Sequence, residues 1–82
     1  MADRVNIDIE YCVPCNYLAR AAWMAQEILT TFPVNVASVK LVASRGGRFE
    51  VSVDGELVFS TIQMGRFPEV QEIREKIRDK LS

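Results

Sequence analysis

The chain has 82 residues, of which 49% are hydrophobic and 26% are charged, and its formal net charge is −1. This length allows one small domain, residues 1–82, with a shallow core. Acidic and basic residues are interspersed, so we expect no nucleic-acid partner, and no apolar run reaches the roughly 20 residues that a membrane span needs. The start of the chain lacks a signal-peptide pattern, and we therefore expect a cytoplasmic protein.

The first half of the sequence predicts a strand, a helix and a second strand. Polar and apolar residues alternate over residues 4–11, which indicates a strand with one buried face. Apolar residues then recur at helical spacing until Pro33 ends the pattern, and Pro14 is expected in the opening turn of this helix. The expected buried stripe consists of Leu18, Ala21, Ala22, Ala25, Ile28, Leu29 and Phe32. Residues 36–44 are rich in β-branched and apolar side chains, as a strand would be.

The second half predicts a hairpin and a second helix. Residues 49–53 alternate between apolar and polar side chains, and Asp54-Gly55 is a strong signal for a tight turn into a strand over residues 57–61. The last helix is expected to open near Pro68. Its apolar stripe consists of Val70, Ile73, Ile77 and Leu81.

The order β-α-β-β-β-α predicts an α/β (α+β) fold. A strand–helix–strand unit of this length is right-handed, with its two strands parallel. The simplest arrangement is therefore a four-stranded mixed sheet with both helices on one face. This is the minimal thioredoxin-like arrangement. It places the segment Cys12-Val13-Pro14-Cys15 at the carboxyl end of the first strand, where open α/β sheets carry their chemistry.

Cys12 and Cys15 are the only cysteines of the chain, and we expect them to be the catalytic residues. Two thiols in a C-x-x-C pattern can close a small disulfide, and in such motifs at helix N-termini the thiol pKa falls to between about 3.5 and 7.5. Arg20 and Arg45 are candidate thiolate partners, and ordinary solvated charges are the alternative interpretation. A zinc site normally takes four ligands, and the sequence has no histidine and no third cysteine, so no metal is predicted. The other alternative to a redox site is that both cysteines are buried as small apolar residues and take part in no chemistry.

The motifs of the chain resemble those of the selenoprotein W-like, or Rdx, family of small thioredoxin-fold proteins. The resemblance is carried by residues 9–17 (IEYCVPCNY), Phe32-Pro33, residues 47–60 (GRFEVSVDGELVFS) and residues 65–68 (GRFP). It implies a thiol-based oxidoreductase linked to glutathione, with glutathione or protein thiols and disulfides as partners and no other cofactor. Selenocysteine-containing members carry that residue at the position of Cys15. In the usual thioredoxin arrangement the first thiol, here Cys12, is the exposed one, so the order of attack stays open.

Two functions of different class agree with these residues. One is a thiol–disulfide oxidoreductase that cycles Cys12 and Cys15 between dithiol and disulfide. The other is a redox-responsive interaction module, in which the same disulfide changes the binding of a protein partner without turnover. Helical spacing also places Trp23 roughly opposite the Leu18–Ala25–Leu29 stripe, where it is expected either to contact a protein partner or a second copy, or to fold over neighbouring side chains.

Overall fold

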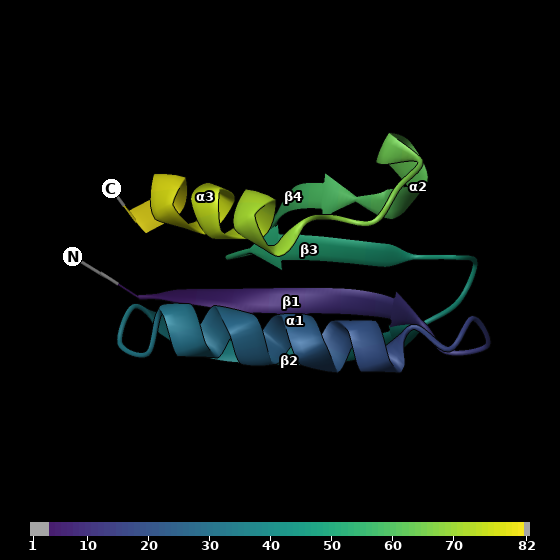
Figure 1. Ribbon diagram of the computed structural model, residues 1–82, viewed down its shortest axis with the longest axis horizontal. Coiled ribbons are helices and arrows are strands. Elements are labelled where there is room, and N and C mark those ends of the chain that lie inside the picture. Colours follow the sequence, from purple (N-terminus) through teal and green to yellow (C-terminus); the bar gives the residue numbers. More distant parts are fainter. Residues whose placement is uncertain (1–3, 82) are drawn as a thin grey trace.

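The computed structural model describes residues 4–81, and Figure 1 shows how its elements are arranged. In chain order they are β1 (Val5–Cys12), α1 (Leu18–Thr31), β2 (Val36–Ser44), β3 (Phe49–Val53), β4 (Glu56–Ser60), α2 (Thr61–Met64) and α3 (Val70–Leu81). Within the described part of the chain, no helix is both long enough and apolar enough to cross a bilayer.

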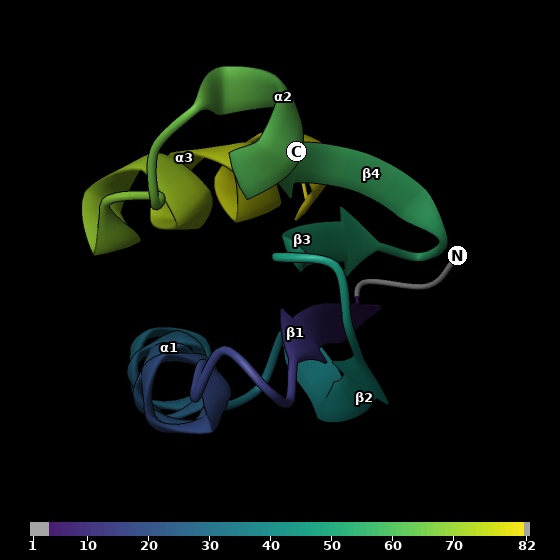
Figure 2. The same ribbon diagram turned by 90° about the vertical axis from the view of Figure 1, so that its right-hand side faces the viewer.

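The four strands form one mixed sheet in the order β2-β1-β3-β4. β1 pairs in parallel with β2 and antiparallel with β3, and β3 pairs antiparallel with β4. Both long helices, α1 and α3, lie on the same side of the sheet (Figure 2). The predicted βαβ unit, the hairpin and the one-sided arrangement of helices are therefore confirmed.

The hairpin turn at Asp54-Gly55 forms as its sequence predicts. Both residues have left-handed backbone angles, with φ of 49° at Asp54 and 85° at Gly55, which suits the tight turns that join two antiparallel strands. Asp54 also continues the pairing of β1 with β3. Its carboxylate accepts a hydrogen bond from the Asn6 N–H at 2.9 Å, and its own N–H donates to the Asn6 carbonyl at 2.8 Å.

The core lies between the sheet and the two long helices. Its strand side comes from the alternating residues of β1 and β3, and Ile7, Ile9 and Val51 are fully buried there. The helix side comes from α1 and from the predicted stripe of α3, in which Ile73 and Ile77 are fully buried. Burying one such aliphatic side chain contributes about 1.5–3 kcal/mol, so these few residues carry much of the stability of a small fold.

The face that α1 turns to the sheet differs from the expected one. Ala21, Met24 and Ile28 are its buried residues, whereas Leu18 and Leu29 are 51% and 43% exposed. Ala22 is exposed as well. The expected stripe was too wide, because apolar residues cover more of this helix than the sheet can contact. Met24, which is not part of the expected stripe, lies inside the core.

The boundaries of two elements also differ. α1 begins at Leu18, so Pro14 lies in the turn before the helix and not in its first turn. β4 ends at Ser60, one residue before the predicted end, and is followed at once by the short helix α2, which was not expected from the sequence. The Ser60 hydroxyl caps α2 by accepting a hydrogen bond from the Gln63 N–H at 3.3 Å, and Gly65 ends it with a left-handed φ of 74°.

Two arginines fix the position of α3. Arg74 reaches α1, where its Nη2 lies 3.0 Å from the Glu27 carboxylate and its Nε donates to the Thr31 hydroxyl at 2.9 Å. Arg66, just before α3, donates two hydrogen bonds to the Glu72 carboxylate, at 2.9 and 2.7 Å. These hydrogen bonds from Arg66 lower the pKa of Glu72 from 4.5 to about 2, and the same pairing raises the pKa of Arg66.

The lowered pKa of Glu72 predicts a pH-dependent contribution to stability. Because the folded state favours the carboxylate, the contribution is fully present above pH 4.5 and is lost as the pH falls toward about 2. We expect Glu72→Gln to be slightly less stable than the parent at neutral pH, and the difference to shrink across that window. Urea denaturation at a series of pH values measures it. Glu75→Gln, on the exposed side of α3, serves as the control, and a difference that stays constant with pH would contradict the assignment.

The orientation of α1 predicts unequal costs for two neighbouring truncations. Ile28 is fully buried, so Ile28→Ala should cost about 2–5 kcal/mol of unfolding free energy. Leu29→Ala should lower the unfolding free energy by well under half as much, because Leu29 is already 43% exposed in the folded protein. Chemical denaturation of both variants at low protein concentration provides the comparison, and equal losses would show that α1 faces the sheet differently.

Candidate redox site

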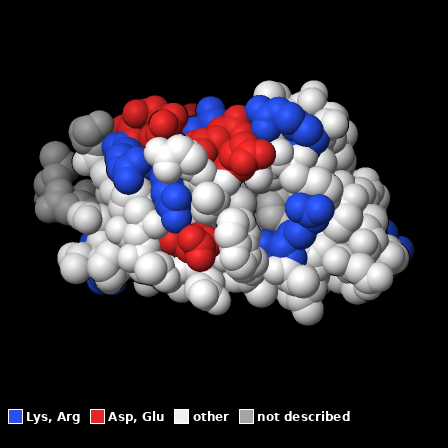
Figure 3. Space-filling view, viewed as in Figure 1, with Lys and Arg blue, Asp and Glu red and all other residues white. Residues whose placement is uncertain are grey.

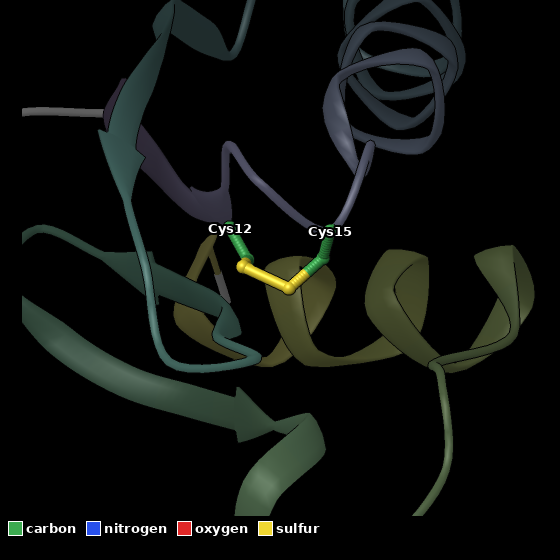
Figure 4. Close-up of a disulfide and its surroundings, with 2 residues drawn as sticks. All are labelled: Cys12 and Cys15. Atoms are coloured by element: carbon green, nitrogen blue, oxygen red, sulfur yellow. A yellow bond between two sulfur atoms is a disulfide. The ribbon is translucent and has the colours of Figure 1, made fainter.

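The two predicted site residues are joined in a disulfide. Cys12 is the last residue of β1 and Cys15 lies in the turn before α1, as Figure 4 shows. Their Cα atoms are 5.3 Å apart, which is within the range that a disulfide spans without backbone movement. The strand and the turn therefore place the two sulfur atoms in bonding contact.

Main-chain hydrogen bonds shape the turn that carries Cys15. The Asn16 N–H donates to the Val13 carbonyl at 3.1 Å, and the Tyr17 N–H donates to the Cys12 carbonyl at 3.3 Å. Asn16 has a left-handed φ of 63°, a conformation that asparagine adopts more readily than most residues. The Val13 N–H donates to the Ser44 carbonyl at 2.9 Å, which ties the turn to the end of β2.

The two cysteines differ sharply in their access to solvent. Cys12 has 0% of its surface exposed, because it ends a central strand and pairs with Ser44 of β2. Cys15 is exposed, and so is the neighbouring Val13, at 51%. We therefore expect a reagent in solution to reach Cys15 far more readily than Cys12, which is fully covered. The sequence alone leaves this order open, because burial at the end of a strand depends on what packs over it.

The electrostatic surroundings of the turn come mainly from α1. The helix begins three residues after Cys15, so the pair lies before its first turn and not within it. Among the described residues, no side chain caps the N-terminus of α1, and its first turn contains no acidic residue. The partial positive charge at this helix end is therefore not neutralised by a carboxylate from the helix itself.

An aromatic cluster lies next to the turn. The Tyr17 ring meets the Phe67 ring edge-on, with centroids 4.9 Å apart, and Phe67 also contacts Phe49 at 5.5 Å. The guanidinium of Arg20 lies 4.0 Å from the centre of the Phe67 ring, a cation–π arrangement. Arg20, a candidate thiolate partner in the sequence, thus stacks on Phe67, and Arg45 is exposed in the loop between β2 and β3. Local sequence patterns do not indicate this cluster, although residues 65–68 are among those that carry the family resemblance.

Trp23 is exposed to 51%, as its position on the helix predicts. It lines a shallow hollow of about 40 Å³ beside the aromatic cluster. The other residues around this hollow are Arg20, Met24, Phe49, Phe67 and Pro68.

Across residues 4–81, no group of three or more histidine, cysteine or acidic side chains is arranged to bind a metal ion.

The sheet order, the one-sided helices and the C-x-x-C disulfide at the carboxyl end of β1 define a thioredoxin-like protein with a dithiol site. The sequence model of the Rdx family matches residues 6–79, and the chain belongs to this family. The fold, the family and the Cys12–Cys15 disulfide together indicate a redox role.

Solved structures and curated relatives agree with this assignment. A crystal structure of a selenoprotein W-related protein from Vibrio cholerae superposes with a TM-score of 0.93 at 37% identity, covering 96% of this chain and 99% of that one. A Bordetella parapertussis protein gives a TM-score of 0.91 at 40% identity, covering 95% and 99%. Migration and invasion enhancer 1 of Mus musculus is 33% identical over 76 residues, which is 90% of this chain and 63% of the relative's length. The Bos taurus protein of that name matches with the same identity and coverage, so the chain spans under two thirds of these relatives.

The unequal burial of the two cysteines predicts unequal reactivity. Once the disulfide is reduced, an alkylating reagent should modify Cys15 at least several-fold faster than Cys12, because reaction requires access to the sulfur. Rates of iodoacetamide modification of Cys12→Ser and Cys15→Ser, followed by mass spectrometry, compare the two thiols one at a time. The same measurement in denaturant is the control, since unfolding should bring the two rates close together. Equal rates in the folded proteins would contradict the burial of Cys12.

Proposed function

We propose that the protein is a thiol–disulfide oxidoreductase in which Cys12 and Cys15 are the catalytic residues and glutathione is the reductant. One observation supports this above all: an exposed cysteine, Cys15, is disulfide-bonded to a fully buried one, Cys12. In such a pair the exposed sulfur exchanges bonds with molecules in solution. The buried sulfur exchanges bonds only with its neighbour. Each cysteine then has one role.

The reductive half of the cycle begins on the dithiol form. The thiolate of Cys15 attacks one sulfur of a substrate disulfide, forms a mixed disulfide with it, and releases the other substrate sulfur as a thiolate that takes up a proton. The Cys12 thiol then loses its proton and attacks the Sγ of Cys15. This second step forms the Cys12–Cys15 disulfide and releases the remaining substrate thiol, so two electrons have passed from the protein to the substrate.

Glutathione restores the dithiol by the reverse route. A glutathione thiolate attacks the exposed Sγ of Cys15, the bond to Cys12 breaks, and Cys12 leaves as a thiolate that takes up a proton. A second glutathione thiolate attacks the glutathione sulfur of the mixed disulfide, which frees Cys15 and produces glutathione disulfide. A small thiol suits this step, because it reaches Cys15 without moving the residues that cover Cys12. The cycle requires a compartment rich in reduced glutathione, and we propose the cytoplasm.

The order of attack follows from the same burial. Exposure favours Cys15 as the attacking residue and Cys12 as the resolving one. This differs from the usual thioredoxin arrangement, in which the first cysteine of the motif is exposed. It agrees with the position at which selenocysteine occurs in the family that the sequence resembles.

Glutathione titration of single-cysteine variants tests the proposed order. In a glutathione redox buffer, Cys12→Ser should form a stable mixed disulfide with glutathione on Cys15, seen as an added glutathione mass, because no second thiol remains to release it. The Cys15→Ser variant should bind far less glutathione, since its only remaining thiol, on Cys12, is buried. The parent should form the internal disulfide. A glutathione adduct on Cys15→Ser equal to that on Cys12→Ser would contradict the order.

Turnover separates the enzyme from the redox-responsive module. A trace of the parent protein should accelerate the reduction of a small disulfide by glutathione, and neither single-cysteine variant should match its rate on a disulfide that needs the second thiol. If oxidation of the parent is only stoichiometric, with no acceleration, the catalytic proposal fails and the interaction module is the better description.

A further inference from the structure

The outer surface of α1 carries very little charge for a helix at the surface. Arg20 and Glu27 are the only charged residues among its 14, and both are engaged on the side that faces α3, with Phe67 and Arg74 respectively. More than half of the residues of α3, by contrast, are charged. Figure 3 shows the same difference, since most of the charged side chains gather over α3 in the upper half of the view.

The side of α1 that points away from α3 is apolar along its length. With about 100° between successive residues, Leu18 and Leu29 fall within about 20° of each other, and Ala22 and Ala25 lie on either side of that line. The two leucines are 51% and 43% exposed, Ala22 is exposed and Ala25 is partly buried. We call the line of Leu18, Ala22, Ala25 and Leu29 the α1 seam. The structure places no element of the described chain over these exposed leucines.

The α1 seam is symmetric about its own centre. Leu18 and Leu29 are equally far from the midpoint between Trp23 and Met24, and so are Ala22 and Ala25. If two copies of α1 pack antiparallel about a two-fold axis through this midpoint, Leu18 of each copy meets Leu29 of the other. Ala22 meets Ala25 in the same way. A surface that complements itself under a two-fold rotation is the requirement for an isologous dimer.

The sizes of the side chains fit this arrangement. Alanines at the centre allow two helices to approach to about 8 Å between axes, the close end of the usual range. Leucines about 16 Å apart along the helix then supply apolar contact at each end. The spacing of these four positions is common to apolar helix stripes, but the order leucine, alanine, alanine, leucine is the same from either end, so a second copy complements it residue for residue. The symmetry therefore favours a second copy of this chain over another occupant.

We propose that the protein forms a two-fold symmetric dimer through the α1 seam, with the two copies of α1 antiparallel. The turns that carry Cys15 then lie at opposite ends of the interface, one from each copy. Trp23, which the sequence offered as a contact residue, lies outside the seam on the other side of the exposed face. The interface is small, so the dimer forms reversibly, populated at about 100 µM and dissociated near 1 µM.

Sedimentation velocity across that range of concentrations tests the proposal. The parent, with a chain mass of 9.3 kDa, should shift toward twice that mass as its concentration rises. Ala22→Glu and Ala22→Lys should each stay monomeric, because each brings like charges together near the two-fold axis. An equimolar mixture of the two should dimerise again. Ala19→Glu is the matched control, since Ala19 is exposed on the same helix but outside the seam, and it should dimerise like the parent.

A cross-linking experiment tests the orientation of the helices. In a background in which Cys12 and Cys15 are replaced by serine, a mixture of Leu18→Cys and Leu29→Cys should form an oxidised heterodimer. Neither variant should cross-link alone, since like positions lie about 16 Å apart in the antiparallel pair. Circular dichroism of every variant confirms that it is folded.

Several results would overturn the dimer. These are a parent that stays monomeric at the highest concentration, equal disruption by Ala19→Glu and Ala22→Glu, assembly beyond two copies, and cross-linking of Leu18→Cys with itself. None of them bears on thiol exchange, which the glutathione experiments measure separately.

Discussion

The pairing of β1 on both of its edges is the constraint on which the rest of the structure depends. β1 pairs in parallel with β2 and antiparallel with β3, so it forms the centre of the sheet and its alternating side chains enter the core. The same pairing runs to its last residue, where Cys12 lies opposite Ser44. Burial of one sulfur is thus a consequence of how the sheet is built. Cys15, three residues further on, belongs to no strand and stays exposed.

Local patterns predicted most of this fold. The alternation in β1 and β3 and the Asp54-Gly55 turn are signals within a few residues, and they suffice to define the strands and the hairpin. The direction in which α1 faces could not be predicted in this way, because its apolar residues extend well past the side that contacts the sheet. Packing against β1 and β2 selects Met24 and leaves Leu29 outside. α2 spans only four residues, which is too short for a periodic signal.

The candidate site was predictable in its chemistry but not in its environment. A C-x-x-C at the end of a strand indicates both the residues and their place in the fold. The unequal burial of Cys12 and Cys15 depends on long-range packing, and so does the contact of Tyr17 with Phe67, fifty residues apart in the chain. Residues 65–68 carry part of the family resemblance, yet nothing in them indicates which rings the Phe67 side chain contacts.

The hydrogen bond from the Val13 N–H to the Ser44 carbonyl has a consequence for how oxidation state can be sensed. This bond, and the two within residues 12–17, attach the turn to the sheet through main-chain atoms alone. Cleaving the sulfur–sulfur bond breaks none of these hydrogen bonds directly, so we expect the segment to keep its path when the disulfide is reduced. A molecule that tells the oxidised form from the reduced one would then recognise the freed sulfur of Cys15, and not a displaced loop.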